Sequence, residues 1–543
     1  MASFQVRESV ASGFRAAWLV QMVRRFWWLA LLGLTLQAFW TLRLDHPTYF
    51  DAYYYTTNAQ RLAEGQGFSE EIIWQYLDNP QGVPHPSHTY WMPLASIIGA
   101  GGYWLTGSFR GAQLPFWLMA GLLPLLGYAI NWRLTGERAQ AYAAAAFTAV
   151  GGYYAAYWVQ PTTFVLFAWT GGLCLLALGL AHEKDRSRYW LLAGLTAGLS
   201  HLTRADGILF LALAAALWVL ALAQSEPWQR RNDTSWGPSL LNLALLLGGY
   251  LLVMVPWFWR TWQISGSALS TVGTQTIFLT EYDDVFAYKR TFTAGSYLAW
   301  GLENIILSKL EALWLAVQTY IAVPGLTAFS FFAVAGWFWA RRQEHKSRFL
   351  RPFTWYAALL LLTMSLVFTF PGQRGSLLHS STALWPWSMA LVPAGVAAVV
   401  EWVAARRHRW RPQQAQRLFL IAFVLMAFLI TLVVASGQPL AEKEAALYEE
   451  IGAALPPDSI VMTGDPTGFH YHTGLPAVVT PNEPPEVMVQ AAQDFGVDFL
   501  LLDEDRPVPL KELYEGQVQS ERLSFVRDFG DGYHLYAFVA TQE

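Results

Sequence analysis

Long apolar segments alternate with short polar stretches along most of this chain. Many of these segments contain about 18 or more residues, the length that a helix needs to cross the roughly 30 Å hydrocarbon core of a bilayer. We therefore predict a polytopic α-helical membrane protein. The eleven predicted spans cover residues 26–44, 114–132, 139–159, 162–181, 189–203, 207–223, 239–259, 322–340, 353–370, 382–400 and 417–435.

Two further apolar stretches are interpreted as helices that lie in the outer membrane interface. Residues 91–106 are short for a span, and counting residues 297–320 as one would reverse the orientation of the later loops. An amphipathic helix is predicted over residues 54–64, in the same outer loop as the first stretch. The stretch over 297–320 also carries three charged residues, namely Glu303, Lys309 and Glu311.

Basic residues gather in alternate loops, and this asymmetry predicts the orientation of the chain. Cytoplasmic loops of membrane proteins carry an excess of Lys and Arg. With the spans above, one set of loops is basic throughout, for example at Arg133 and Arg138 and over residues 406–411. We therefore expect an integral protein of the plasma (inner) membrane, with a cytoplasmic N-terminus and an extracytoplasmic C-terminal region.

Composition agrees with a membrane protein. The 543 residues are 54% hydrophobic and only 14% charged, whereas about a quarter of the residues in soluble domains are charged. This balance excludes a simple soluble globule and a disordered chain. The net charge of −4 gives no indication of a nucleic-acid partner, and the single cysteine, Cys174, cannot form an intrachain disulfide.

After Ser436 the sequence takes on the character of a soluble domain. We predict two domains, a transmembrane domain over 1–435 and a small extracytoplasmic α/β domain over 436–543. In the second domain, helices are predicted over 441–455 and 485–495, strands over 459–463 and 498–502, and a hairpin of 523–529 with 533–539 about Asp531-Gly532.

Residues 44–94 form the longest polar stretch between the early spans and contain a candidate catalytic residue. Loops of this length are usually functional. Asp51 lies where the chain leaves the bilayer and is followed by three tyrosines, including Tyr54. A carboxylate there could act as a catalytic base, or it could cap the helix that begins at Ala52. The spacing leaves both interpretations open.

Ionisable residues recur at the other outer loops, and such residues at a membrane rim are functional candidates. Arginine is suited to phosphate because its planar fork makes paired, charge-assisted hydrogen bonds. Some of these arginines could instead form structural ion pairs or extend their side chains toward water. The candidates are Arg204 with Asp206, Arg260, Glu281 with Asp283 and Asp284, and Arg374 with His379.

The sequence does not predict a bound metal or cofactor. His85, His88 and His201 occur without the spacing of a zinc or calcium motif, so packing or hydrogen bonding is the favoured interpretation. No phosphate-binding glycine loop of the nucleotide-binding type is present.

In the order of its motifs, the chain resembles the GT-C superfamily of membrane glycosyltransferases, among them protein O-mannosyltransferases and aminoarabinose transferases of lipid A. The similarity extends along the whole chain and ends in an outer C-terminal domain. The motifs that carry it are FDAYYYTTNAQRLAEGQGF, HPSHTYWMPLASII, GLTAGLSHLTRADGILFL, VPWFWRTWQISG and HSSTALWPWSMAL.

This resemblance implies an inverting, metal-independent transfer of a sugar from a polyprenyl-phosphate donor, with Asp51 at the position of the catalytic aspartate. Ala52 stands where the family often has Glu. The acceptor would be a protein, a glycolipid or a polysaccharide. We expect the donor phosphate to be held by Arg204, Arg260, Arg374 and His379, and the sugar or acceptor by Glu281, Asp283, Tyr54 and His85.

Two other function classes are considered. A transporter for a lipid or sugar would show inverted repeats and charges near the middle of the bilayer. Here the charges gather at one face and repeats are not visible. A non-catalytic membrane scaffold would leave Asp51 and the arginines replaceable.

Overall fold

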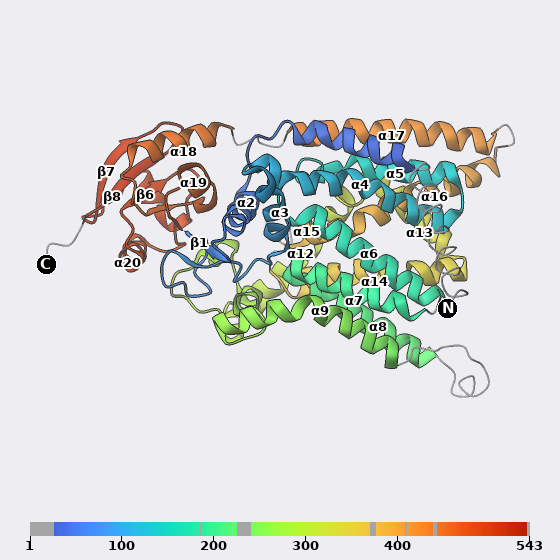
Figure 1. Ribbon diagram of the computed structural model, residues 1–543, viewed down its shortest axis with the longest axis horizontal. Coiled ribbons are helices and arrows are strands. Elements are labelled where there is room, and N and C mark those ends of the chain that lie inside the picture. Colours follow the sequence, from blue (N-terminus) through green and yellow to red (C-terminus); the bar gives the residue numbers. More distant parts are fainter. Residues whose placement is uncertain are drawn as a thin grey trace, which may run out of the picture.

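The computed structural model describes residues 26–184, 186–224, 240–369, 376–407, 410–437 and 442–539. Figure 1 shows an elongated helical bundle with a smaller domain at one end. Eight helices in the described residues are long and apolar enough to cross a membrane, which confirms a polytopic helical protein. They are α4 (Phe109–Thr135), α6 (Thr163–Lys184), α8 (Ile208–Gln224), α9 (Leu240–Ser265), α12 (Leu302–Ala322), α14 (Glu344–Leu366), α16 (Trp385–Ala404) and α17 (Pro412–Ser436).

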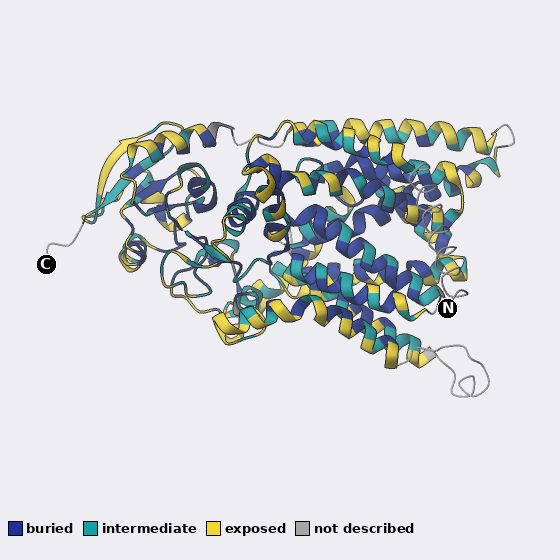
Figure 2. Cartoon of the chain, viewed as in Figure 1, coloured by how far each residue is buried: buried dark blue, intermediate teal, exposed yellow. Residues whose placement is uncertain are grey.

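Four shorter helices complete the set of predicted spans. The first predicted span forms a helix over Phe26–Thr41, and the others correspond to α5 (Arg138–Val150), α7 (Ser187–Thr203) and α13 (Phe329–Arg341). Outward-facing positions along α17 and α9 are exposed (Figure 2). Many of these positions are apolar, such as Val433, which is 73% exposed. Exposed apolar side chains on long helices are expected where lipid replaces water.

Helix α12 corrects the interpretation of residues 297–320 as interfacial. It runs antiparallel to α14, because Lys309 Nζ lies 3.4 Å from Val367 O and Tyr320 OH donates to Ala357 O at 2.8 Å. The two helices therefore pack side by side within the bundle. The three charged residues had argued against a span, but they lie in the first half of α12, and most of its remaining residues are apolar.

Close packing at α7 fixes the place where Arg204 leaves the helix. A Cβ atom at Gly194 would come within 2.0 Å of Leu246 O on α9. One at Gly207 would meet the backbone of Ser200 at 2.3 Å. Small residues allow membrane helices to approach this closely. The 3₁₀ turn over Ala205–Gly207 can therefore fold back against α7 and hold the Arg204 side chain at the end of the bundle.

The first outer loop contains the two predicted helices, α2 (Phe50–Ala63) and α3 (Leu94–Thr106). Residues 52–59 of α2 are all buried, since α2 packs against α3 on one side and the C-terminal domain on the other. Helix α2 thus lies inside the protein. The loop also folds back on itself through β1 (Ser69–Glu70) and β3 (His85–Pro86), which pair antiparallel.

The C-terminal region forms the predicted small α/β domain around a six-stranded sheet of order β2-β5-β4-β6-β8-β7. The predicted helices and strands correspond to α18 (Glu442–Ala454), β4 (Val461–Thr463), α20 (Pro485–Phe495), β6 (Phe499–Leu502), β7 (Leu523–Asp528) and β8 (His534–Phe538). The elements that were not predicted include α19 (Pro466–Thr473) and β5 (Ala477–Val479). They are short, and α19 contains Pro, Gly and Thr, which are poor helix formers.

One edge strand of this sheet comes from the first outer loop. β2 (Ile72–Ile73) pairs parallel to β5, with Ile72 opposite Ala477 and Ile73 opposite Val478. Both isoleucines are fully buried. The C-terminal domain and the loop that carries Asp51 are therefore parts of one hydrogen-bonded sheet.

Candidate active site

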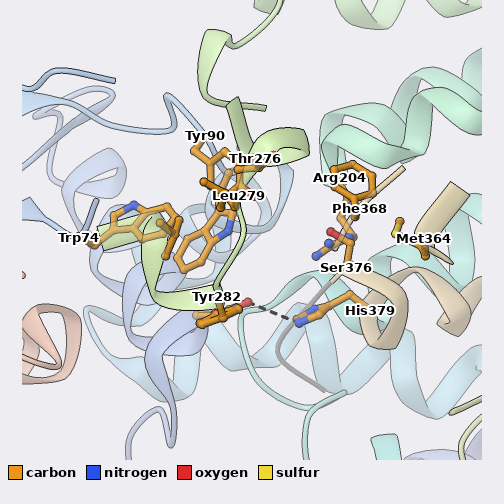
Figure 3. A pocket seen from close by; sticks show the side chains of 13 residues that line it. Trp74, Tyr90, Arg204, Thr276, Leu279, Tyr282, Met364, Phe368, Ser376 and His379 are labelled. Carbon is orange, nitrogen blue, oxygen red and sulfur yellow. Dashed lines mark ion pairs between the residues drawn. The ribbon is translucent and has the colours of Figure 1, made fainter. Parts of the chain in front are cut away.

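A cavity of about 150 Å³ opens at the end of the bundle that faces the C-terminal domain. Its walls come from the first outer loop, the corner after α7, the second outer loop, the end of α14 and the short helix α15 (Ser376–Ser380). Figure 3 shows these side chains around the opening. The lining residues are Asp51, Trp74, Tyr90, Trp91, Arg204, Thr276, Leu279, Tyr282, Val285, Met364, Phe368, Ser376 and His379.

Asp51 lies in the first turn of α2, and its side chain is 21% exposed. The residue that caps α2 is Tyr49, and no side-chain capping bond is seen there. The interpretation of Asp51 as the N-cap is therefore wrong. Burial raises the pKa of Asp51 to about 6, although the nearby Arg204 guanidinium acts in the opposite direction. A carboxylate with such a pKa is a stronger base than a solvated one and is still largely ionised at neutral pH.

His379 lies beside Asp51, with 3.7 Å between His379 Nε2 and Asp51 Oδ2 (dashed line in Figure 3). Its other ring nitrogen, Nδ1, is 3.1 Å from Thr163 Oγ1. The ring of Phe164 stacks on the imidazole at 4.1 Å between centroids. These contacts fix both the position and the plane of the histidine ring.

Hydrogen bonds hold the Arg204 guanidinium at the wall of the cavity. Its Nε donates to Asp206 Oδ1 and to Ser380 Oγ, both at 3.2 Å, and Nη1 donates to Thr163 Oγ1 at 3.4 Å. Ser380 in turn donates to Asp206. The predicted ion pair with Asp206 therefore exists, yet the guanidinium also lines the cavity. Among the described residues, no hydrogen bond occupies Arg204 Nη2.

The structure does not bring Arg260 to this cavity. Its Nη2 donates to Phe68 O at 3.2 Å and to Ser87 O at 2.7 Å, and the guanidinium lies over the rings of Phe68 and Trp257. Arg260 thus braces the folded first loop against α9.

Tyr54 and His85 also lie outside the cavity, in a buried polar network near Arg260. The Tyr54 hydroxyl accepts a hydrogen bond from the backbone N–H of His88 at 2.9 Å. His85 Nε2 is 3.4 Å from Glu70 Oε1 and 2.8 Å from Ile72 O. Burial raises the pKa of Glu70 to about 7. This network supports the folded first loop beside α2.

The remaining candidates border the cavity or fall outside the description. Glu281 and Asp283 flank Tyr282, which lines the cavity, but neither lines it itself. Their neighbour Asp284 accepts hydrogen bonds from the backbone N–H groups of Thr280 and Glu281 and so shapes this turn. Arg374 lies outside the described residues. The same description contains no group of three His, Cys, Asp or Glu residues that could hold a metal ion.

Aromatic residues form the part of the site that sequence reasoning missed. Trp74 and Trp91 stack at 4.2 Å and 18° between ring planes, and both line the cavity with Tyr90 and Tyr282. Nothing in their local sequence marks them, because many aromatic residues in this chain have the same kind of neighbours. Trp74 could have been found only from the pairing of β2 with a sheet formed far along the chain.

Comparisons with known proteins agree with this architecture. The family model for dolichyl-phosphate-mannose-protein mannosyltransferase matches residues 85–259, a segment that includes Arg204. No curated protein sequence matches the chain significantly.

Two solved structures share the fold. ArnT from Cupriavidus metallidurans bound to undecaprenyl phosphate is 14% identical, with a TM-score of 0.56 over 96% of this chain and 99% of that one. The archaeal oligosaccharyltransferase AglB from Archaeoglobus fulgidus, in complex with an inhibitory peptide and a dolichol-phosphate, is 14% identical, with a TM-score of 0.55 over 91% of this chain and 71% of that one. The chain therefore shares the fold of ArnT and AglB, and its residues 85–259 are similar to the mannosyltransferase family.

Proposed function

We propose that this protein is an inverting glycosyltransferase that moves a sugar from a polyprenyl-phosphate donor to an acceptor hydroxyl at the extracytoplasmic face of the plasma membrane. The observation that carries the proposal is the convergence of Asp51 and Arg204 on one cavity, where a base and a cation face the same space. The matched structures of ArnT and AglB contain undecaprenyl phosphate and dolichol-phosphate, which supports a lipid-phosphate donor.

In this proposal Asp51 accepts the proton of the acceptor hydroxyl as its oxygen attacks the anomeric carbon. The bond between that carbon and the phosphate oxygen breaks on the opposite face, so the configuration at the carbon is inverted. The electron pair of the broken bond stays on the lipid phosphate, which changes from a diester with one negative charge to a monoester that approaches two. The proton remains on Asp51 until solvent removes it.

Arg204 serves the leaving phosphate. Charge grows on the phosphate during bond breaking, so a cation aimed at it stabilises the transition state more than the bound donor. Asp206 and Ser380 hold Nε, while the guanidinium lines the cavity. The guanidinium is thus oriented before the donor arrives, and little reorganisation is needed during the reaction.

His379 is proposed to position Asp51 as well as to lie near the phosphate. Thr163 Oγ1 accepts from Arg204, so its own hydrogen can be donated to His379 Nδ1. That arrangement leaves the proton of the neutral ring on Nε2, where it faces Asp51. Arg374 completes the proposed phosphate ligands, while Glu281 and Asp283 remain proposed sugar or acceptor contacts. Arg260, Tyr54 and His85 are assigned to support of the first loop.

We propose the C-terminal domain, residues 436–543, as the acceptor-side cover of the transmembrane domain. Thr467 on α19 donates to Phe50 O at 3.0 Å, one residue before Asp51. This contact joins the cover directly to the helix that carries the proposed base.

The test is transfer of radiolabelled sugar from synthetic polyprenyl-phosphate sugars to extracted cell-envelope acceptors by the purified protein. We expect wild-type transfer and a loss of about a thousandfold or more in Asp51→Asn. Glu64→Gln is the matched control, because Glu64 is an exposed carboxylate at the end of the same helix. Full activity in folded Asp51→Asn protein would refute the proposed base.

A further inference from the structure

A second and larger cavity lies beside the site described above. It measures about 490 Å³ and is enclosed by three parts of the chain that are distant in sequence. The first outer loop contributes Tyr76 and Gln81, the second outer loop contributes Gln275 and Tyr288, and the end of α20 contributes Phe495. The cavity therefore exists only when the C-terminal domain is docked on both loops.

Aromatic rings form one wall of this cavity and are rigidly held. Tyr76 stacks on Phe495 at 5.8 Å and 27°, and Tyr288 meets Tyr76 edge-on at 5.1 Å. Both hydroxyl groups are already used, since Tyr76 donates to Val479 O and Tyr288 donates to Asp494. What remains for a ligand is ring carbon surface of fixed orientation.

Side-chain amides supply the polar part of the wall. Asn79 and Gln81 are exposed at the opening. Gln275 donates from Nε2 to Leu77 O at 2.9 Å, which orients its amide. An amide side chain carries both donors and an acceptor. This mixture matches hydroxyl groups, each of which donates and accepts.

The charged residues of this cavity are paired with opposite charges. Lys289 Nζ is 2.6 Å from Asp494 Oδ2. Arg290 contacts Asp284 Oδ1 at 2.8 Å and Glu483 Oε1 at 2.6 Å. An anionic ligand would have to displace a carboxylate from its cation, so the cavity favours a neutral ligand.

The two cavities share a continuous wall. Residues that are close in sequence line different cavities. Trp74, Thr276 and Val285 line the cavity that contains Asp51, whereas Tyr76, Gln275 and Tyr288 line the second cavity. We propose that the second cavity binds a neutral saccharide segment of the acceptor, whose reacting hydroxyl extends along this wall toward Asp51. The acceptor role rests on the proposed function, whereas saccharide binding does not.

The experiment measures binding by the full-length protein in detergent without any donor. Saturation-transfer NMR is recorded with maltotriose, chitotriose, mannotriose and, as a comparison, a tetra-alanine peptide. The variants are Gln81→Ala, which removes an amide at the opening, and Thr291→Trp, which fills the cavity from an exposed lining position. Gln517→Ala is the control, since Gln517 is an exposed glutamine elsewhere in the C-terminal domain.

We expect at least one trisaccharide to bind and the peptide not to bind. The affinity should fall at least fivefold in Gln81→Ala and Thr291→Trp and should be unchanged in Gln517→Ala. Absence of binding by every trisaccharide, binding of the peptide alone, or binding that survives in either cavity variant overturns the inference. Saccharide binding without sugar transfer would refute the proposed function instead, and transfer without saccharide binding would refute this inference alone.

Discussion

His379 lies beside Asp51 in the wall of the smaller cavity, with 3.7 Å between His379 Nε2 and Asp51 Oδ2. Behind the histidine, Thr163 Oγ1 lies 3.1 Å from Nδ1 and accepts from Arg204 Nη1 at 3.4 Å. One threonine therefore supports both the residue beside the proposed base and the proposed phosphate ligand. The chemistry proposed for this site depends on how these four side chains are held relative to one another.

Arg204→Lys is expected to lower kcat about a hundredfold. A lysine keeps the charge but cannot hold Asp206, Ser380 and Thr163 with a fixed planar group while still facing the donor. The loss corresponds to about 3 kcal/mol of transition-state stabilisation. Steady-state kinetics with varied donor will measure it. Arg110→Lys is the matched control, because Arg110 also pairs with an aspartate, Asp45, but lies outside the cavity. An equal loss in both variants would contradict a specific role for Arg204.

Thr163→Val is expected to lower kcat about tenfold with little change in protein yield. Valine has nearly the same shape but cannot bond Arg204 or His379, and a hydrogen bond is worth about 1 kcal/mol net. Thr170→Val serves as control, since Thr170 is buried on the same helix and its hydroxyl has no hydrogen-bond partner among the described residues. If both variants retain full activity, the proposed support of the base and the cation through Thr163 is wrong.

Thr467→Val tests the link between the C-terminal domain and the proposed base. The change removes the contacts of Thr467 Oγ1 with Phe50 O and with Asp465 Oδ1, and we expect kcat to fall about fivefold because the start of α2 is held less firmly. In Thr473→Val the lost hydrogen bonds, to Phe469 O and from the N–H of Leu475, both lie within the C-terminal domain, so transfer should be unchanged. Activity assays on both variants will separate the two explanations. A loss in Thr467→Val alone supports positioning of α2 by the C-terminal domain, whereas an equal loss in both variants indicates a general effect on α19.

Asp51→Asn should raise the melting temperature at pH 7.5 while abolishing transfer. Because burial raises the pKa of Asp51 to about 6, the ionised carboxylate opposes folding above that pH, by up to about 3 kcal/mol. The cost fades as the pH falls toward 4, where the folded protein holds Asp51 protonated. Thermal unfolding in detergent at pH 7.5 and at pH 4.5 will show the difference. A lower melting temperature for Asp51→Asn at pH 7.5 would contradict a buried, destabilised carboxylate.

Sequence periodicity predicted the features that depend on local composition. Apolar runs located the helices of the bundle, and the alternation of loops placed Asp51, Arg204 and His379 on one face, where the structure brings them to one cavity. Helix α12 was misinterpreted because three charges in its first half outweighed its length and its many apolar residues.

The parts that sequence reasoning could not predict depend on long-range pairing. β2 has two residues, too few for any alternating pattern, and its partner β5 lies at the other end of the chain. The pairing of Ser69 with Pro86 turns His85 toward Glu70 and away from the cavity. Arg260 and Tyr54 share that side of the loop. His85, Arg260 and Tyr54 are residue types that often bind ligands, but only the folded loop shows that their side chains lie outside the cavity.

The pH dependence of single-turnover transfer tests the central claim most directly. Asp51 must be ionised to accept the acceptor's proton, and its pKa is about 6. The rate should therefore reach a plateau above about pH 7 and fall about tenfold for each unit of pH below 6. A rate that is flat between pH 5 and pH 8, or one that rises as the pH falls, would contradict Asp51 as the base.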